Sequence, residues 1–391
     1  MKVLQVHNEY IHVGGEDAVV GAEKLLLISR DQQVVQFFVT NEHINNIIAK
    51  CKIGIVASYS KEAKNWLAEK ITQNNAEIIH VHNFFPLLTP SIYDACHEAR
   101  VPVVQTLHNY RIICTGALLM RSGKVCEQCI YGSPYQAVLY GCYRNSRLGS
   151  LAVARMIDYH RKRRTWQTKV DRFIALTHFA KDKFIEAGLP AEKISVKPNF
   201  YNYSGEDHRN GARKGALFVG RLSREKGIYT LLEAWQRLEI PLRIAGDGPL
   251  MSEVSQKGVS SIITLLGSIA SNQVADEMLK ALFLVMPSVW YEGFPMVLVE
   301  AFAHGLPVIA SRLGSMAEIV EDGVTGLHFE AGNADDLAAK VKWMHEHPDE
   351  CRRMGENARK VYEEKYTPER NYEMLMDIYQ QAIDERKKRA D

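Results

Sequence analysis

The strongest constraint on the fold of this chain is an alternation, repeated in both halves, between short apolar runs and longer segments of helical period. The apolar runs of the first half are residues 3–6, 34–39, 77–81, 102–107, 172–176 and 194–197. Those of the second half are residues 216–220, 242–246, 262–267, 282–286 and 307–311. Such runs, separated by helices, are typical of βαβ units. The pattern predicts an α/β protein with two Rossmann-like, doubly wound parallel-sheet domains, whose ligands bind at the carboxyl ends of the strands.

The segment 198–215 separates the two halves, because it is polar, rich in turn-forming residues and without a periodic apolar face. A chain of 391 residues is also long enough for two domains. We predict an N-terminal domain at 1–198, a C-terminal domain at 214–370 and a helix at 371–391 that crosses the domain junction. Residues 110–165 interrupt the rhythm of the first half, and we interpret them as an insertion with helical content.

Composition limits the classes of partner. The chain has 48 Lys and Arg residues against 46 Asp and Glu, so its net charge gives no argument for a polyanionic partner. Basic residues do cluster between Arg144 and Arg164, but this segment holds a single aromatic residue, Tyr159, which argues against nucleic-acid binding. No apolar run reaches the roughly 18 residues of a membrane span, and the first residues lack the pattern of an export signal. We therefore expect a cytoplasmic protein.

Two glutamates that follow the fourth apolar run of the second half are the most informative pair. Glu292 lies in a turn-rich segment, and Pro295 suits the first turn of a helix that would contain Glu300. Backbone amides around Gly293 and Phe294 can donate to an anion or to sugar hydroxyls, and a carboxylate deeper on the helix can accept both hydroxyls of a ribose. A single Glu is more often a solvated charge, but the position at a strand end favours a ligand site.

Three further strand-end segments are rich in cations or glycine. Arg221 and Lys226 lie in one turn, where two fixed cations suit a diphosphate, although a basic turn is as common on any protein surface. Gly246 begins a glycine-rich turn that is a weak signal by itself. Gly15 precedes a helix that we expect to begin around Asp17, so the backbone could approach a phosphate or an acceptor closely. An ordinary loop is the competing interpretation.

Together these motifs resemble those of a known family. The two glutamates separated by seven residues, the turns at 220–227 and 246–250, and the KPNF sequence at 197–200 are similar in order and type to those of the retaining GT-B glycosyltransferases of family four. Members of that family act in bacterial lipopolysaccharide, capsule and exopolysaccharide synthesis. The resemblance implies two Rossmann-like domains facing a cleft.

The resemblance also implies a role for each motif. Glu300 would bind the ribose of a nucleotide-sugar donor, Glu292 would hold the sugar, and His108 would lie near the transferred sugar, although a lone histidine at a strand end is more often structural. The implied catalytic residues are His108, Arg221, Lys226 and Glu292. The implied donor-binding residues are Gly15, Arg221, Lys226, Gly246, Gly293, Phe294, Pro295 and Glu300.

The chain contains no Asp-x-Asp motif, so Arg221 and Lys226 would neutralise the departing diphosphate without a divalent metal. The resemblance implies a hexosyltransferase that retains the anomeric configuration by front-face transfer and needs no cofactor for catalysis. We expect a UDP-sugar donor, with a GDP-sugar next, and a glycan or polyprenyl-linked acceptor. A sugar-nucleotide epimerase on the same fold and a non-catalytic nucleotide-sugar-binding protein remain the alternatives.

The basic segment suggests contact with an anionic membrane surface. One helical stripe consists of Leu148, Ala152, Met156 and Tyr159, beside Arg144, Arg155 and Lys162. Such a helix could rest on anionic lipid at the inner face of the plasma membrane and meet a lipid-linked acceptor. Val153 and Ile157 on the far side favour a buried helix equally.

Four cysteines of the insertion predict a structural metal site. They are Cys114, Cys126, Cys129 and Cys142. The two-residue spacing between Cys126 and Cys129 lets two thiolates reach one tetrahedral ion, with Zn as the expected metal. Four reduced cysteines, some of them buried as small hydrophobic residues, are the alternative.

Overall fold

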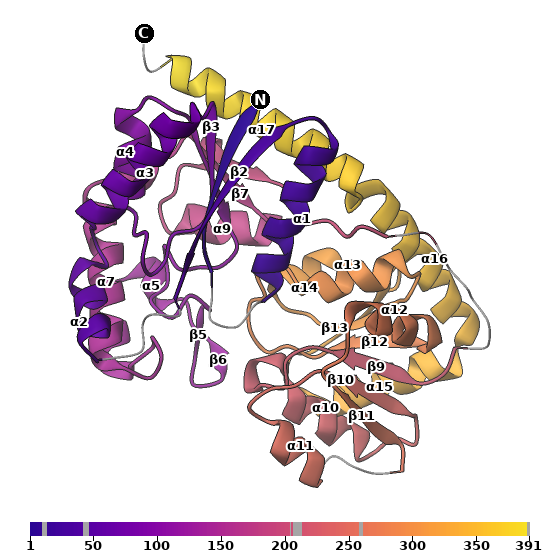
Figure 1. Ribbon diagram of the computed structural model, residues 1–391. Helices are drawn as coiled ribbons and strands as arrows, with labels where there is room; N and C mark the ends of the chain where they lie inside the picture. Colours follow the sequence, from indigo (N-terminus) through magenta and orange to yellow (C-terminus); the bar gives the residue numbers. More distant parts are fainter. Residues whose placement is uncertain (10–13, 42–46, 204, 206–212, 258–260, 389–391) are drawn as a thin grey trace. The chain divides into compact units, whose positions relative to one another are not determined.

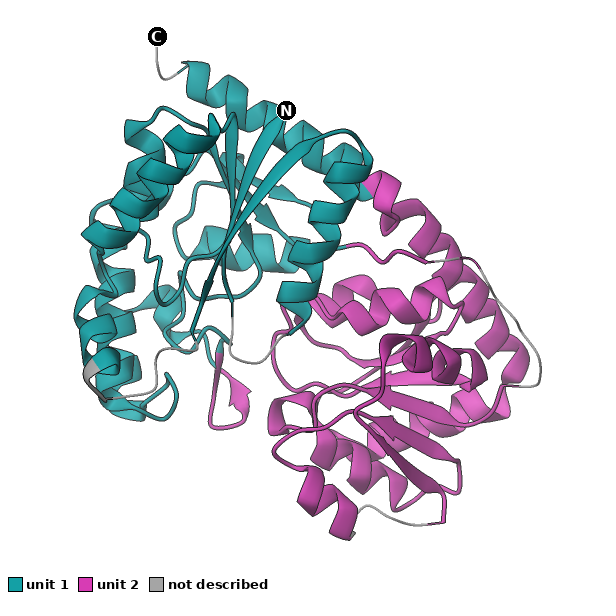
Figure 2. Cartoon of the chain, viewed as in Figure 1, with its two compact units in different colours: residues 1–119, 126–199, 371–391 teal, residues 120–125, 200–370 magenta. Residues whose placement is uncertain are grey.

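The computed structural model describes residues 1–9, 14–41, 47–203, 205, 213–257 and 261–388. It divides the chain into two compact units (Figure 1; Figure 2). Unit 1 consists of Met1–Leu119, Cys126–Asn199 and Asn371–Asp391, and unit 2 consists of Met120–Val125 and Phe200–Arg370. Much of the segment that we expected to separate the domains, residues 204 and 206–212, lies outside the described residues.

Unit 1 is built on a six-stranded parallel sheet in the order β2-β1-β3-β4-β7-β8. Its strands are β1 (Lys2–Glu9), β2 (Gln33–Thr40), β3 (Ile78–Asn83), β4 (Val103–Leu107), β7 (Arg172–Ala175) and β8 (Ile194–Val196). Its helices are α1 (Gly15–Ser29), α2 (Ile47–Val56), α3 (Lys61–Asn74), α4 (Ile92–Glu98), α5 (Gln128–Tyr131), α6 (Gln136–Tyr140), α7 (Arg147–Lys162), α8 (Thr165–Thr168), α9 (His178–Glu186), the 3₁₀ turn η1 (Ala191–Lys193) and most of α17 (Pro368–Lys388).

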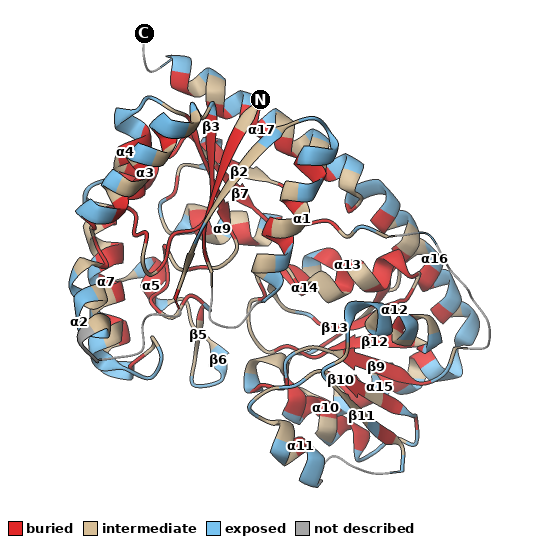
Figure 3. Cartoon of the chain, in the orientation of Figure 1, coloured by how far each residue is buried: buried red, intermediate tan, exposed pale blue. Residues whose placement is uncertain are grey.

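The central strands of this sheet are covered on both faces, as parallel sheets require (Figure 3). All six residues of β3 and all five of β4 are buried. Because side chains alternate between the two faces of a strand, His80 and His82 of β3 share one face. This fold therefore places two polar rings inside unit 1, where each needs a hydrogen-bonding partner.

The insertion at 110–165 contains the antiparallel pair β5 (Met120–Arg121) and β6 (Lys124–Val125) as well as α5, α6 and α7. Ser146 caps the start of α7 by accepting a hydrogen bond from the backbone amide of Gly149 at 3.1 Å. We predicted that Leu148 and Met156 share one exposed stripe of α7. This prediction is wrong, because Met156 is fully buried whereas Leu148 is 80% exposed. Positions four residues apart drift by roughly 40° around a helix, so two steps turn Met156 toward the buried side.

Unit 2 is built on a second six-stranded parallel sheet, in the order β11-β10-β9-β12-β13-β14. Its strands are β9 (Ala216–Val219), β10 (Leu242–Ala245), β11 (Ile263–Gly267), β12 (Phe283–Met286), β13 (Val308–Ser311) and β14 (Gly326–Phe329). Its helices are the 3₁₀ turn η2 (Arg224–Lys226), α10 (Ile228–Trp235), α11 (Met251–Lys257), α12 (Ser271–Lys280), α13 (Met296–Ala303), α14 (Gly314–Ile319), α15 (Ala334–Glu346) and α16 (Pro348–Lys365).

Both faces of the second sheet carry a hydrophobic core. Along β9, Ala216 and Phe218 belong to one cluster of buried residues, and Leu217 between them belongs to another. The predicted fold class, two doubly wound parallel sheets, is confirmed, and a strand lies at the position of each apolar run. The strand β14 was missed, because its four residues include a glycine and a histidine and so form no apolar run.

No helix in the described parts of the chain combines the length and the apolar character needed to cross a membrane.

Candidate functional site

The predicted donor-binding motifs of unit 2 follow three neighbouring strands, in the order β10-β9-β12. Gly246 follows β10, Arg221 and Lys226 follow β9, and Glu292 follows β12. Because the strands are parallel, the three turns lie along one edge of the sheet. The connections run in opposite directions on either side of the boundary between β9 and β12, which is where doubly wound sheets bind their ligands.

Two glycines let these turns approach one another. Gly246 has a φ of 142°, and a Cβ atom there would lie 1.9 Å from the carbonyl oxygen of Gly220. Gly227 ends the η2 turn with a φ of 72°, and a Cβ atom there would lie 1.8 Å from the carbonyl oxygen of Pro287, just after β12. Only glycine fits at both positions. Packing of the turns therefore explains Gly246 without any ligand.

Lys226 and Glu292 are in direct contact. The Lys226 Nζ atom lies 2.8 Å from Glu292 Oε1, and the Ser288 hydroxyl donates to the same oxygen at 2.6 Å. The Glu292 side chain is 6% exposed and the Lys226 side chain 23% exposed. The Ser315 hydroxyl donates to the carbonyl oxygen of Glu292 at 2.8 Å and so fixes the backbone of this turn. The carboxylate is thus held in place while the ammonium group remains reachable from solvent.

The helix that contains Glu300 begins just after the Gly-Phe-Pro turn. Pro295 precedes the first helical residue, Met296, so Pro295 occupies the capping position and not the first turn that we expected. The backbone amides of Gly293 and Phe294 belong to the segment that leads into this helix. Burial raises the pKa of Glu300 to about 7, so its carboxyl is poised between its neutral and ionised forms at neutral pH. Arg221 is exposed on its turn.

The predicted residues of unit 1 also follow strands. His108 comes directly after β4, and its Nε2 atom lies 3.1 Å from Nδ1 of His82 on β3, with the two rings stacked. Gly15 is the first residue of α1, and a Cβ atom added there would meet no described atom within 4 Å. The described protein atoms therefore give no packing reason for glycine at this position.

The sequence analysis missed a set of buried polar residues around His82. They include Glu23 of α1, His80 of β3 and Lys197 after β8, each of them at most 2% exposed. A signal existed in the two histidines that alternate with apolar residues in β3. Their partners could not be found from the sequence, because Glu23 and Lys197 are 174 residues apart.

The four cysteines of the predicted metal site are only partly brought together. Cys114 and Cys129 interact through their side chains, and a hydrogen bond from Cys114 lowers the pKa of Cys129 to about 6. Among the described residues, the group of three or more potential metal ligands close to one another contains none of the four cysteines. The structural metal site stays a prediction, which elemental analysis of protein purified without a metal-affinity tag will test.

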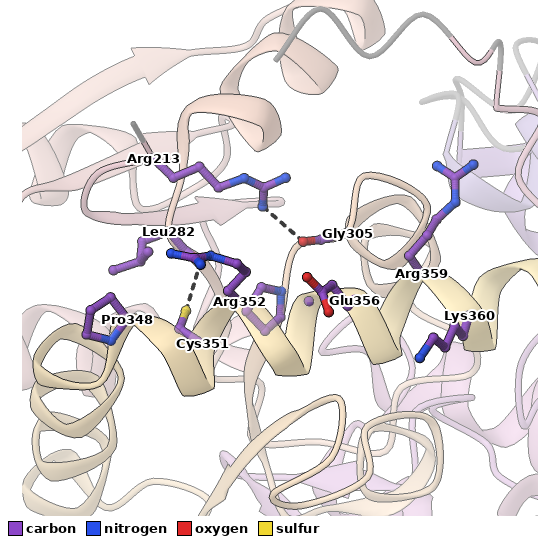
Figure 4. A pocket seen from close by; sticks show the side chains of 11 residues that line it. Arg213, Leu282, Gly305, Pro348, Cys351, Arg352, Glu356, Arg359 and Lys360 are labelled. Carbon is purple, nitrogen blue, oxygen red and sulfur yellow. Dashed lines mark hydrogen bonds between the residues drawn. The ribbon is translucent and has the colours of Figure 1, made fainter. Parts of the chain in front are cut away.

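A separate pocket of about 630 Å³ lies at the opposite end of the second sheet, where the strands begin (Figure 4). It is lined by Leu282 and Pro307, which precede β12 and β13, whereas Glu292 follows β12. Its arginines already have partners in the protein. Arg213 donates to the carbonyl oxygens of His304 and Gly305 at 2.6 and 3.0 Å, and Arg359 donates to the Glu363 carboxylate at 2.7 Å. We assign no ligand to this pocket.

Two family models match adjoining parts of the chain. The model described as Glycosyltransferase Family 4 matches residues 30–204, and the model described as Glycosyl transferases group 1 matches residues 203–361. The chain belongs to the family-four GT-B glycosyltransferases. The family expected from the strand-end motifs is thereby confirmed.

Relatives of this glycosyltransferase include an uncharacterized glycosyltransferase of Methanocaldococcus jannaschii, 32% identical over 222 residues, in a match that covers 56% of this chain and 61% of that protein. The alpha-D-kanosaminyltransferase of Streptomyces kanamyceticus is 23% identical over 349 residues, which cover 84% of each protein.

Solved structures support the fold. The complex of Anabaena HepE with UDP superposes with a TM-score of 0.66 at 18% identity, covering 96% of this chain and 99% of that one. The sucrose-phosphate synthase of Thermosynechococcus elongatus superposes with a TM-score of 0.72, also at 18% identity, covering 97% of this chain and 99% of that one.

Proposed function

We propose that this family member transfers a sugar from a nucleotide-diphosphate donor to a glycan or lipid-linked acceptor. The observation that carries the proposal is the ion pair between Lys226 and Glu292 at the boundary of β9 and β12. It sets a cation suited to a diphosphate beside a carboxylate suited to sugar hydroxyls. A UDP-sugar is the preferred donor, because HepE was solved with UDP and with UDP-glucose.

Each residue of this site has a distinct role in the proposed reaction. Glu300, once ionised, accepts the two ribose hydroxyls. Arg221 and Lys226 stabilise the charge that develops on the departing diphosphate, which removes the need for a divalent metal. Glu292 orients the sugar for transfer to the face from which the diphosphate leaves, with retention of the anomeric configuration. His108 contacts the transferred sugar.

Mass spectrometry of the protein with UDP- and GDP-sugars and a lipid extract tests this function. We expect release of the nucleoside diphosphate together with an acceptor that is heavier by one sugar, and retention then requires an α-linked product from an α-linked donor. An isomerised sugar still attached to its nucleotide would indicate an epimerase. A donor that binds and is never consumed would indicate a non-catalytic binding protein. The Glu292→Gln variant is the control for enzyme-dependent transfer.

We also propose that the insertion of unit 1 rests on an anionic membrane surface. Leu139 and Tyr140 at the end of α6 and Leu148 at the start of α7 are 71%, 57% and 80% exposed. Arg144 and Arg147 between them are exposed as well. Exposed apolar side chains interleaved with arginines suit the interface of an anionic bilayer, at which a lipid-linked acceptor would be available. This surface would place the protein at the inner face of the plasma membrane.

Sedimentation with liposomes tests the membrane surface. We expect binding that increases with the fraction of anionic lipid and decreases in the Leu148→Glu variant. The matched control is Leu25→Glu, because Leu25 on α1 is 69% exposed and lies outside the insertion. Binding that is indifferent to anionic lipid, or that both variants reduce equally, would contradict the proposal.

A further inference from the structure

A continuous line of buried polar groups leads through unit 1 to His108. The Lys197 Nζ atom lies 3.3 Å from Glu23 Oε2 and 3.1 Å from Oδ1 of Asn371. The other carboxylate oxygen of Glu23, Oε1, lies 3.3 Å from Nε2 of His82, a charge contact without the geometry of a hydrogen bond. The Nδ1 atom of His82 lies 3.1 Å from Nε2 of His108. Each end of the His82 ring therefore faces one member of this line.

Donors surround the Glu23 carboxylate. Gln5 donates its amide hydrogen to Oε1 at 3.0 Å, and Nδ1 of His80 lies 3.0 Å from the same atom. Burial by itself would raise the pKa of Glu23, but His80, Lys197 and His82 together hold the pKa well below its usual value. Glu23 is therefore a buried anion at neutral pH.

The two histidines that follow in this line are neutral. Burial lowers the pKa of His82 to about 3 and also lowers the pKa of His108 well below its usual value. A neutral imidazole carries its proton on one nitrogen and a lone pair on the other, so the tautomer decides which atom can accept a hydrogen bond. An anion 3.3 Å from Nε2 of His82 favours a proton on that nitrogen, because a lone pair there would face negative charge.

The proton on Nε2 of His82 leaves a lone pair on its Nδ1. His108 must then donate from Nε2 across the 3.1 Å contact, and its own lone pair falls on Nδ1. We propose that Glu23, acting through His82, is the positioning residue that fixes His108 in this tautomer, so that Nδ1 of His108 accepts a hydrogen bond from a hydroxyl of the bound sugar. The step that involves the sugar rests on the proposed function, whereas the tautomer does not.

A metal ion bound by Glu23, His80 and His82 is the competing explanation of this cluster, because their ligand atoms all lie within 4.8 Å of one another. Other protein groups already contact the atoms that would bind such an ion. The Lys197 ammonium shares the Glu23 carboxylate, and the two ring nitrogens of His80 contact the Tyr379 hydroxyl at 2.8 Å and the Thr106 hydroxyl at 2.7 Å. A divalent cation would add uncompensated charge to a buried site.

Nitrogen NMR of the wild-type protein with ¹⁵N-labelled histidine tests the tautomer directly. Long-range proton–nitrogen correlations distinguish the two ring nitrogens, and the spectrum of a His108→Asn variant assigns the His108 signals. We expect His82 and His108 to be neutral near neutral pH, with the proton on Nε2 in both. A proton on Nδ1 of His108, or a charged His108 ring, would overturn the proposal whether or not any variant folds.

The Glu23→Leu Lys197→Met double variant tests the cause. It removes the buried carboxylate and the buried ammonium together, so that neither is left as an uncompensated charge, and Nε2 of His82 loses the anion that faces it. We expect the protons of His82 and His108 to be no longer confined to Nε2 and kcat to fall at least about tenfold. The Kd for UDP should stay unchanged, because Arg221, Lys226 and Glu300, which are proposed to hold the nucleotide, belong to unit 2.

The Thr106→Val variant is the matched control, because it removes the partner of Nε2 of His80, whereas the other ring nitrogen, Nδ1, is the one near Glu23. We expect it to keep the wild-type tautomers and kcat. A His108 proton that stays on Nε2 in the folded double variant would overturn the proposal. The expected tautomers in a protein that transfers no sugar would contradict the proposed function and leave the tautomer assignment standing.

Discussion

The two units share the same sheet architecture, but their lysine–glutamate ion pairs differ in exposure to solvent. In unit 1, Lys197 and Glu23 are both 2% exposed and lie 3.3 Å apart, with Asn371 and Gln5 as further partners. In unit 2, Lys226 lies 2.8 Å from Glu292, but its side chain is 23% exposed. A buried pair with all its partners in the protein serves as a fixed scaffold. A pair open to solvent can exchange one partner for a ligand.

The largest expected difference between the two pairs is in stability. Removal of one partner from a fully buried ion pair leaves an uncompensated charge and costs about 3 to 5 kcal/mol. Without Lys226, in contrast, Glu292 would still accept the hydrogen bond of Ser288. We expect Lys197→Met to lower the free energy of unfolding by an amount in this range and Lys226→Met to lower it by less. Urea denaturation measures both. Equal losses would mean that the two pairs do not differ as their exposure indicates.

The next effect concerns turnover. Glu292→Gln keeps the shape of the side chain and an acceptor for Ser288 but loses the charge that faces Lys226. We expect kcat to fall roughly 100-fold while the donor Kd changes little, because Glu292 acts on the reacting sugar. Ser288→Ala removes a single neutral donor from the same carboxylate and should reduce kcat much less. A loss confined to donor affinity in the Glu292 variant would assign this residue to binding alone.

A smaller effect should appear in the pH dependence of nucleotide binding. Burial raises the pKa of Glu300 from 4.5 to about 7, and only the ionised carboxylate accepts ribose hydroxyls. We expect the affinity for UDP to fall by up to about tenfold for each pH unit below this pKa. The contribution of Glu300 to stability has the opposite direction. It is fully present below pH 4.5 and is lost as the pH rises through about 7, because the folded protein favours the neutral carboxyl.

The Glu300→Gln variant should lose both pH dependences, since its side chain does not titrate. Titration of UDP at several pH values and the unfolding midpoint at the same values measure the two effects. An unchanged pH profile of binding in this variant would mean that another group titrates in the nucleotide site.

The smallest effect should come from metal removal. Because Arg221 and Lys226 supply the positive charge for the diphosphate, we expect excess EDTA to leave the initial rate of sugar transfer unchanged. Rates with added Mg²⁺ and Mn²⁺ are the control. A strict requirement for either ion would contradict a site in which side chains alone neutralise the diphosphate.

The donor motifs could be predicted from the sequence because each belongs to a turn directly after an apolar strand. Arg221, Lys226 and Glu292 follow β9 and β12, and parallel strands bring such turns to one edge whatever the rest of the fold does. The contact between Lys226 and Glu292 could not be predicted, because it also depends on β9 and β12 being neighbours in the sheet.

The line of buried polar groups that leads to His108 could not be predicted from the sequence for a related reason. Glu23 is on α1, His82 on β3 and Lys197 after β8, so their meeting depends on helix packing as well as on strand order. The prediction for α7 failed at Met156 for a more local reason. A four-residue repeat does not stay on one face of a helix, and the apolar residues of the opposite face, Val153 and Ile157, determine which side is buried.

Calorimetric titration of UDP and GDP into two single variants separates the donor site from the pocket at the opposite end of the second sheet. Glu300→Ala changes the carboxylate proposed to hold the ribose, and Arg352→Ala changes an exposed cation that lines the pocket. We expect Glu300→Ala to raise the Kd of the nucleotide that binds by at least about tenfold, or about 1.4 kcal/mol, and Arg352→Ala to leave it unchanged. Weakened binding in Arg352→Ala together with normal binding in Glu300→Ala would contradict a nucleotide site at the carboxyl ends of the strands.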